Sequence, residues 1–251
     1  MNREENWRRL KTHRKRLSDQ DIQGFAEVLF QDQEDWLREK LWLRDDVTLV
    51  FELLSCLGRA GSTKAAEILL EQLNAGEEVL QIAAAEALKQ CPPILVLEPL
   101  TKIMQEQNPG SVKAGEILLS FGDEGSQALW QMWFGENRPV RLKSQILQLL
   151  TEARDDHAES LAFLAFLSGE EELVRMALKT AEELDTTSLW GNVAECLKSP
   201  GWQLRGKAAY ILGRWKESNA LVHLQDMGVD DDPWVEEERQ KAMELLSESR
   251  A

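Results

Sequence analysis

The chain has 251 residues and a formal net charge of −15 at neutral pH, with 29% charged and 43% hydrophobic residues. It is too apolar for a disordered protein, and no run of residues approaches the ~20 apolar positions needed to cross a bilayer. One Tyr, seven Pro and long stretches rich in Leu, Ala, Glu and Lys predict helices rather than a sheet.

The first 17 residues, MNREENWRRLKTHRKRL, are strongly basic. Seven Arg or Lys residues accompany Glu4 and Glu5, so this segment carries +5 and residues 18–251 carry −20. The segment lacks the apolar core of a secretion signal, and a cytoplasmic protein is expected. An acidic body repels phosphate backbones, which disfavours general nucleic-acid binding.

Residues 1–45 are predicted to form a basic N-terminal arm followed by capping helices. As a helix, the arm has Trp7, Leu10 and Leu17 on one side and basic residues on the other. We expect it to dock on the acidic surface of its own chain. A membrane or nucleic-acid adaptor acting through this arm is an alternative.

From residue 46 onward a two-helix unit recurs, with a helix A, a short turn and a helix B. The first inward apolar residues of the A helices are spaced by 28 to 34 positions: Leu49, Leu80, Val112, Val140, Val174, Leu204 and Val235. Four A helices follow a proline, at Pro109, Pro139, Pro200 and Pro233. Proline suits the first turn of a helix, where its missing N–H has no partner.

The B helices show the same period through small or β-branched residues near their starts. These residues are spaced by 28 to 32 positions: Ala65, Val96, Ala128, Ser160, Ser188 and Ala220. Each pair of helices is too short to bury its apolar face alone. The sequence therefore predicts stacked hairpins that share one elongated core.

This pattern, most clearly PGWQLRGKAAYILGRWKESNALVHL at 200–224, resembles HEAT repeats. The period near 31 is similar to the short bacterial type named after phycobilisome lyases. The resemblance covers residues 46–247 and implies an all-α, right-handed α-solenoid over 46–251 that ends in a C-terminal cap. It also implies a structural ladder in which acidic turn residues (Asp123, Asp156, Asp185, Glu217) pair with early basic residues of neighbouring A helices (Lys113, Arg141, Arg175, Arg205).

The residues predict no catalytic site, metal site or cofactor. HEAT-like hydroxylases hold two irons with His-Glu pairs, and this chain has no His-Glu dipeptide; its histidines are His13, His157 and His223. No Gly-rich phosphate loop or Cys-x-x-Cys pair is present, and Cys56, Cys91 and Cys196 are expected to be buried thiols. HEAT-like DNA glycosylases use a basic groove, which this acidic body lacks. A bilin-lyase-like chaperone or enzyme subunit is the alternative that the family implies.

The B helices carry the candidate binding residues. Counted from the small residue, positions two and six further on are predicted to face outward. They are acidic in the first repeats, at Glu67, Glu71 and Glu98, although Lys102 is basic. In the next three they are Trp130 and Phe134, Ala162 and Phe166, and Trp190 and Ala194.

Because B helices generally line the concave side of HEAT arrays, the resemblance implies an aromatic strip with an acidic rim. We therefore predict a non-catalytic scaffold or adaptor that binds a basic and apolar peptide or helix. Trp130, Phe134, Phe166 and Trp190 are the expected anchors. The alternative is that helix rotation turns these rings inward, or that a terminal segment covers them.

Overall fold

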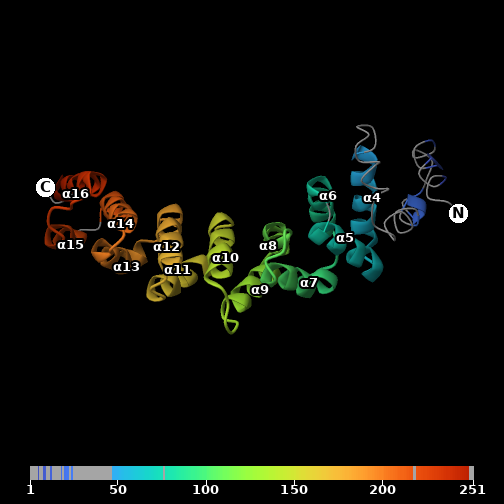
Figure 1. Ribbon diagram of the computed structural model, residues 1–251, viewed down its shortest axis with the longest axis horizontal. Helices are drawn as coiled ribbons and strands as arrows, with labels where there is room; N and C mark the ends of the chain where they lie inside the picture. The colour runs from blue at the N-terminus through green and yellow to red at the C-terminus, as the bar shows by residue number, and fades with distance from the viewer. Residues whose placement is uncertain are drawn as a thin grey trace. The chain divides into compact units, whose positions relative to one another are not determined.

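The computed structural model describes residues 47–75, 77–216 and 219–248, together with separate positions between residues 5 and 24. From Val47 to Glu248 the described residues form 13 α-helices and two short 3-10 helices, and no β-strand occurs among the described residues. The chain divides into two compact units, Met1–Gly135 and Glu136–Ala251. The fold is therefore all-α, and each unit is a stack of helical hairpins of the solenoid type (Figure 1).

The described part of unit 1 from Val47 onward forms three hairpins. Their A helices are α4 (Val47–Ala60), α6 (Glu78–Leu88) and α8 (Ser111–Ser120), and their B helices are α5 (Thr63–Ala75), α7 (Pro93–Gln105) and α9 (Asp123–Trp133). Helix α6 packs against both α4 and α8, and α7 packs against both α5 and α9. Two layers result, one of A helices and one of B helices.

Unit 2 repeats this arrangement. Its A helices are α10 (Val140–Glu152), α12 (Glu171–Leu184), α14 (Trp202–Trp215) and α16 (Pro233–Glu248). Its B layer consists of α11 (His157–Leu167), the broken segment η2 (Thr187–Leu189), α13 (Trp190–Glu195) and η3 (Cys196–Lys198), and α15 (Ala220–Asp226). Each A helix packs against the next, and α13 packs against α15.

The predicted alternation of A and B helices is confirmed from α4 to α16. The prolines act as expected, since Pro139 is the residue before α10 and Pro233 is the first residue of α16. One inward position is wrong: Val112 is 56% exposed, and Ser111 and Ala114 are buried instead. The spacing located α8 correctly but placed its buried face one position away.

Small residues allow neighbouring helices to approach closely. A Cβ atom on Gly58 of α4 would lie 2.3 Å from the Ala87 carbonyl oxygen of α6. A Cβ atom on Gly125 of α9 would lie 1.7 Å from the Leu118 carbonyl oxygen of α8. No other residue type fits these crossings without moving the backbone.

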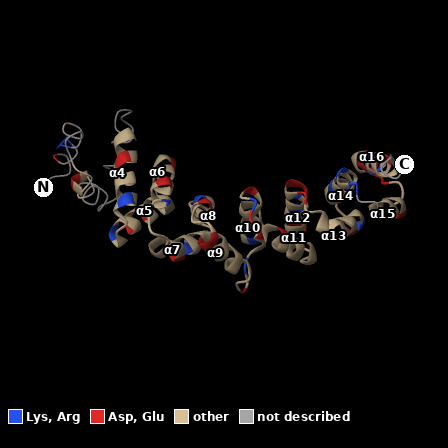
Figure 2. Cartoon of the chain, turned by 180° about the vertical axis from the view of Figure 1, so that it is seen from behind, with Lys and Arg blue, Asp and Glu red and all other residues tan. Residues whose placement is uncertain are grey.

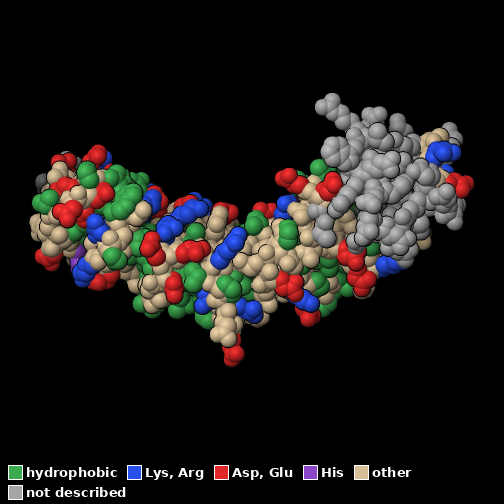
Figure 3. All heavy atoms as spheres, viewed as in Figure 1, with side chains coloured by type: hydrophobic (Ala, Val, Ile, Leu, Met, Phe, Trp, Pro, Cys, Tyr) green, Lys and Arg blue, Asp and Glu red, His purple; other side chains and the backbone are tan. Residues whose placement is uncertain are grey.

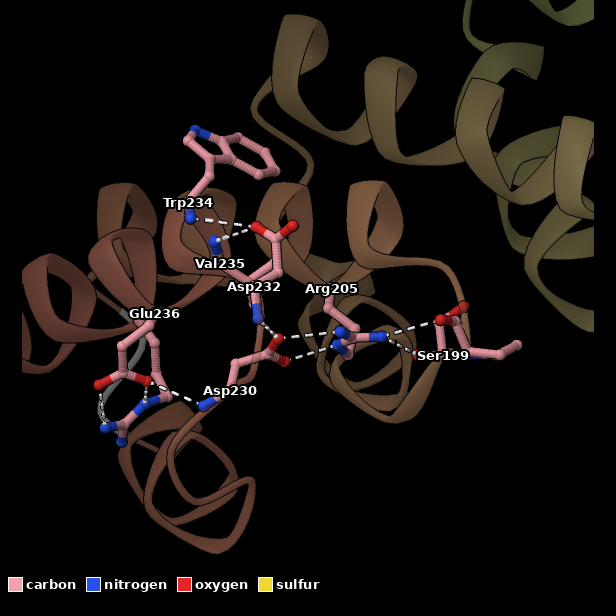
Figure 4. Close-up of polar contacts among 9 residues, drawn as sticks. Ser199, Arg205, Asp230, Asp232, Trp234, Val235 and Glu236 are labelled. Carbon is pink, nitrogen blue, oxygen red and sulfur yellow. Dashed lines mark hydrogen bonds and ion pairs between the residues drawn. The ribbon is translucent and has the colours of Figure 1, made fainter.

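A polar network joins α14, the loop before α16 and α16 itself (Figure 4). Arg205 donates to both carboxylate oxygens of Asp230, at 2.6 and 2.9 Å, and to the carbonyls of Ser199 and Pro200. Glu236 accepts from the Asp230 backbone N–H at 3.1 Å and from Arg239, at 2.7 and 2.8 Å. This network closes the last hairpin.

The implied charge ladder is not what these side chains form. Arg205 pairs with Asp230, which precedes the next A helix, and Arg175 pairs with Glu171 of its own helix at 2.9 Å. Asp185 instead accepts a hydrogen bond from Trp215 Nε1 at 2.8 Å. Glu217 lies outside the described residues, as do most residues of the predicted N-terminal arm and capping helices.

Candidate functional site

The predicted aromatic residues of unit 1 lie together at the end of α9. Trp130 and Phe134 are one turn apart, with ring centroids 4.9 Å from each other and ring planes inclined by 63°. Phe134 is 54% exposed and Trp130 is partly buried. An edge-to-face pair of this kind is a rigid apolar contact surface.

The three predicted acidic residues lie in the B layer of the same unit. Glu67 and Glu71 are exposed one turn apart on α5, and Glu98 is exposed on α7, which packs against α5. Helix α7 also packs against α9. Unit 1 therefore presents carboxylates and the aromatic pair in one layer of helices.

The two predicted aromatic anchors of unit 2 are not free-standing surface rings. Phe166 and Trp190 are partly buried, and both pack against the buried apolar cluster of this unit. The Trp190 ring also lies 6.1 Å, between centroids, from the His223 ring of α15. Much of each side chain therefore contributes to packing within the unit.

The predicted outward positions of α11 and α13 are partly wrong. Ala162 and Ala194 are 0% and 1% exposed. In α11 the exposed apolar side chains are instead Phe163 at 42% and Leu167 at 63%. They are spaced by four residues and so share one face of the helix.

The sequence of α11 explains these exposed rings. From Leu161 to Leu167 it reads LAFLAFL, which is apolar on every face of a helix, and its ribbon is mostly tan in Figure 2. One face packs into unit 2 through four buried residues: Ala158, Leu161, Ala162 and Ala165. The remaining apolar positions have no buried side to occupy. This continuous apolar run indicates that large side chains such as Phe163 stay exposed, whereas counting positions from Ser160 does not single out Phe163.

Two recesses lie beside α11 and share Asn192 of α13 as a lining residue. We call them together the α11–α13 groove. The first recess, of about 470 Å³, is lined by Asp156, Glu159, Phe163, Leu164, Ser188 and Asn192, among others. The second, of about 440 Å³, is lined by Phe166, Leu167, Glu171, Asn192, Glu195 and Cys196, among others. In Figure 3 hydrophobic side chains lie among acidic and basic ones along the lower edge of unit 2.

The first recess has an acidic entrance. Asp156 directly precedes α11 and is exposed, and Glu159, in the first turn, accepts a hydrogen bond from Ser188 of η2. No Lys or Arg is among the described residues that line this recess. Two carboxylates beside an apolar wall favour a ligand group that is cationic at one end and apolar at the other.

The second recess is more nearly neutral at its edge. Its carboxylates are paired, Glu171 with Arg175 at 2.9 Å and Glu195 with Lys198 at 3.0 Å. Burial, assisted by Glu195, raises the pKa of Cys196 to about 12, so this thiol stays protonated near neutral pH. A protonated, buried thiol is a weak nucleophile.

Two further properties of the described residues concern function. No group of three or more His, Cys, Asp or Glu residues among them is placed to hold a metal ion. None of the helices that the structure describes combines the length and apolar character required to cross a membrane.

No family model matches the chain, and no curated protein matches it in sequence. Three solved structures align with most of the chain. Human deoxyhypusine hydroxylase in complex with glycerol is 18% identical, with a TM-score of 0.41 over 99% of this chain and 92% of that one. The archaeal HEAT-like repeats protein from Thermococcus onnurineus NA1 is 12% identical, with a TM-score of 0.46 over 94% of this chain and 99% of the other. An engineered protein is 17% identical, with a TM-score of 0.32 over 89% and 96% of the two chains.

Proposed function

We propose that the protein is a non-catalytic binding module that receives an apolar and basic segment of a partner protein in the α11–α13 groove. The observation that carries this proposal is that α11 exposes Phe163 and Leu167 between two recesses. Large side chains that stay exposed on a folded surface gain from burial against a partner. The groove thus supplies the apolar part of the binding energy.

Charge selects the kind of partner. Asp156 and Glu159 at the first recess attract a Lys or Arg, and the net charge of −15 steers basic segments toward the protein. The apolar wall follows one helix, so an amphipathic helix laid along α11 is the matching shape. In unit 1 we propose a second contact through Trp130 and Phe134, with an acidic rim formed by Glu67, Glu71 and Glu98. That these B helices line a concave face stays a prediction.

The test uses three designed 17-residue helical peptides with the same apolar face and net charges of about +5, 0 and −5. Binding of each labelled peptide to the full chain is measured by fluorescence anisotropy. The cationic peptide is expected to bind at least tenfold more tightly than the anionic one, and increasing salt should reduce the difference.

Substitutions then locate the binding site. Phe163→Ala combined with Leu167→Ala should weaken binding of the cationic peptide roughly 10- to 100-fold, because about 1.4–2.8 kcal/mol of apolar contact is removed. Asp156→Asn should weaken it less and flatten its salt dependence. Phe134→Ala measures the contribution of unit 1.

Val112→Ala is the matched control. Val112 is 56% exposed, but it lies on α8, an A helix outside both proposed contacts. Its replacement should leave the affinity unchanged. Unchanged affinity in the Phe163/Leu167 double variant, with circular dichroism showing that it is folded, would exclude the groove as the binding site.

A further inference from the structure

Two exposed indole rings stand together on the A layer of unit 2. Trp202 begins α14 and is 46% exposed, and Trp234 is the second residue of α16 and is 40% exposed. Their ring centroids lie 5.8 Å apart, with 83° between the ring planes. We call the surface formed by these two rings with Asp231 and Asp232 the indole shelf. Each ring keeps an apolar surface that packing within the unit leaves uncovered.

The loop before α16 gives the indole shelf a negative charge. Of its three consecutive carboxylates, Asp230 pairs with Arg205, whereas Asp231 is exposed. One oxygen of Asp232 accepts a hydrogen bond from the Trp234 backbone N–H at 3.0 Å, and no described residue donates to its other oxygen. Figure 4 shows the Trp234 indole on one side of Asp232 and the Asp230–Arg205 pair on the other. Three carboxylates against one guanidinium leave an excess of two negative charges beside the rings.

A cation already occupies a comparable arrangement further along α14. Lys207 Nζ lies over the Tyr210 ring, 5.0 Å from its centre, and forms an ion pair with Glu182 of α12. A ring face and a carboxylate there share one cation, which both of them attract. At the indole shelf the rings and the carboxylates are present, but no Lys or Arg of the described residues lies over either indole. The shelf is therefore complementary to a cation that comes from another molecule.

We propose that the indole shelf binds an arginine side chain of a partner protein. The guanidinium group is planar, so it can lie flat on an indole face while it donates to the free oxygen of Asp232. A lysine ammonium is a more strongly hydrated point charge, and it cannot stack in this way. The shelf lies on the A layer, whereas the α11–α13 groove follows α11 in the B layer. The inference therefore goes beyond the proposed function and does not depend on it.

The experiment uses the full chain with isotope-labelled indole groups and follows the Nε1–H signals of Trp202 and Trp234 by NMR. The probes are three peptides that share a Gly-Ser scaffold and carry one central residue, which is arginine, its neutral isostere citrulline, or lysine. The arginine peptide should shift both signals. It should bind roughly tenfold more tightly than the citrulline peptide and roughly threefold more tightly than the lysine peptide.

Substitutions locate the probe on the shelf. Trp202→Leu keeps an apolar side chain but removes one ring, and Asp232→Ser keeps an oxygen that caps α16 but removes the charge. Each should weaken arginine binding roughly fivefold or more, as read from the Trp234 signal. Phe134→Leu and Asp226→Ser are the matched controls, because they remove an exposed ring of unit 1 and an exposed carboxylate at the end of α15. Both controls should leave the affinity unchanged, and circular dichroism checks that every variant is folded.

The outcomes decide the occupant and the place. Equal affinity for the arginine and citrulline peptides overturns the inference, because the carboxylates then take no part. Equal losses in Asp232→Ser and Asp226→Ser also overturn it, because binding then follows net charge alone. A trimethyl-lysine peptide that binds more tightly than the arginine peptide would replace arginine with a quaternary ammonium group as the occupant.

A last comparison separates the shelf from the α11–α13 groove. Arginine binding that persists in the Phe163→Ala/Leu167→Ala chain and is weakened in Trp202→Leu supports the shelf, whatever the fate of the proposed function. Loss of binding in the Phe163/Leu167 chain would place the probe in the groove and overturn the inference.

Discussion

The indole ring of Trp234, on α16, lies directly against Gly206, on α14. A Cβ atom at position 206 would fall 2.0 Å from Trp234 Cζ3, well inside van der Waals contact. Trp202, at the start of α14, meets the same ring edge-on, with 5.8 Å between centroids and 83° between planes. The last two A helices are therefore packed through a glycine that leaves room for an indole.

Replacement of this glycine tests the packing. Gly206→Ala is expected to lower the free energy of unfolding by about 1–3 kcal/mol, because the added methyl group displaces Trp234. This loss should appear even though Ala is favoured over Gly inside a helix by about 1 kcal/mol. Urea denaturation, followed by circular dichroism, measures the change.

Gly191 provides the matched control for that substitution. It lies inside α13, and a Cβ atom there would meet nothing within 4 Å. Gly191→Ala should therefore leave stability unchanged or raise it by up to about 1 kcal/mol. If both variants gained stability alike, the close contact between Gly206 and Trp234 would be refuted.

The network around Asp230 predicts a loss of stability in acid. Hydrogen bonds from Arg239 lower the pKa of Glu236 from 4.5 to about 2, and hydrogen bonds from Arg205 lower the pKa of Asp230. Both ionised forms are favoured in the folded state. Their contribution is fully present above the unfolded-state pKa and is lost as pH falls from about 4.5 toward 2. For Glu236 we expect this contribution to be roughly 1–3 kcal/mol.

Comparison of three proteins isolates this contribution. The natural chain, Glu236→Gln and Glu244→Gln are each unfolded with urea at several pH values between 2 and 7. Glu236→Gln should be less stable at neutral pH and lose less stability on acidification than the natural chain does. Glu244→Gln removes an exposed carboxylate from the same helix and should follow the natural chain. Parallel pH profiles for all three would contradict the assignment.

The helices could be predicted from the sequence because their ends carry local signals. The segment predicted as the fifth helix A, EELVRMALKTAEEL, coincides with α12, which follows the turn at Gly169 and has a clear apolar stripe. Its buried residues recur at helical spacing, as Leu173, Ala177, Thr180 and Ala181 show. Repeat spacing and an unambiguous apolar face together fix such an element.

The exposed faces could not be predicted where those signals conflict. In α11 a run of seven apolar residues does not show which face of the helix is buried. The sequence therefore predicts Ala162 as exposed, whereas Ala162 is buried and Phe163 is exposed. At 187–198 the predicted helix is broken into η2, α13 and η3. The rotation per residue therefore changes along the segment, and counting positions from Ser188 does not predict which way Ala194 faces. Arg205 pairs with Asp230, 25 positions away, because the loop before α16 returns to α14. Tertiary packing decides these positions.

The buried hydroxyl groups of Thr151 on α10 and Thr180 on α12 have three hydrogen-bond contacts between them but only two hydrogen atoms to donate. Thr151 and Thr180 have oxygens 2.8 Å apart, and each also donates to a carbonyl of its own helix, at 2.7 and 2.9 Å. Two hydrogens serve three contacts. Thr151→Val or Thr180→Val alone should cost roughly 0.5–1.5 kcal/mol, whereas the double variant should cost clearly less than their sum. A double-mutant cycle by urea unfolding measures this coupling, and strictly additive costs would argue against it.

The buried cysteines should report the opening of each unit separately. Burial raises the pKa of Cys91, in unit 1, to about 11 and, with help from Glu195, that of Cys196, in unit 2, to about 12. At pH 8 their thiolate fractions are then about 10⁻³ and 10⁻⁴, against roughly 0.2 for an ordinary thiol. Alkylation by iodoacetamide, followed by peptide mass spectrometry, should therefore be at least 100-fold slower in the native protein than in urea.

A urea titration then compares the two units. Equal onset of modification at both sites indicates one cooperative transition, and different onsets indicate that the two units unfold independently. Rapid modification of Cys196 without urea would show that the groove beside α11 opens in the native state.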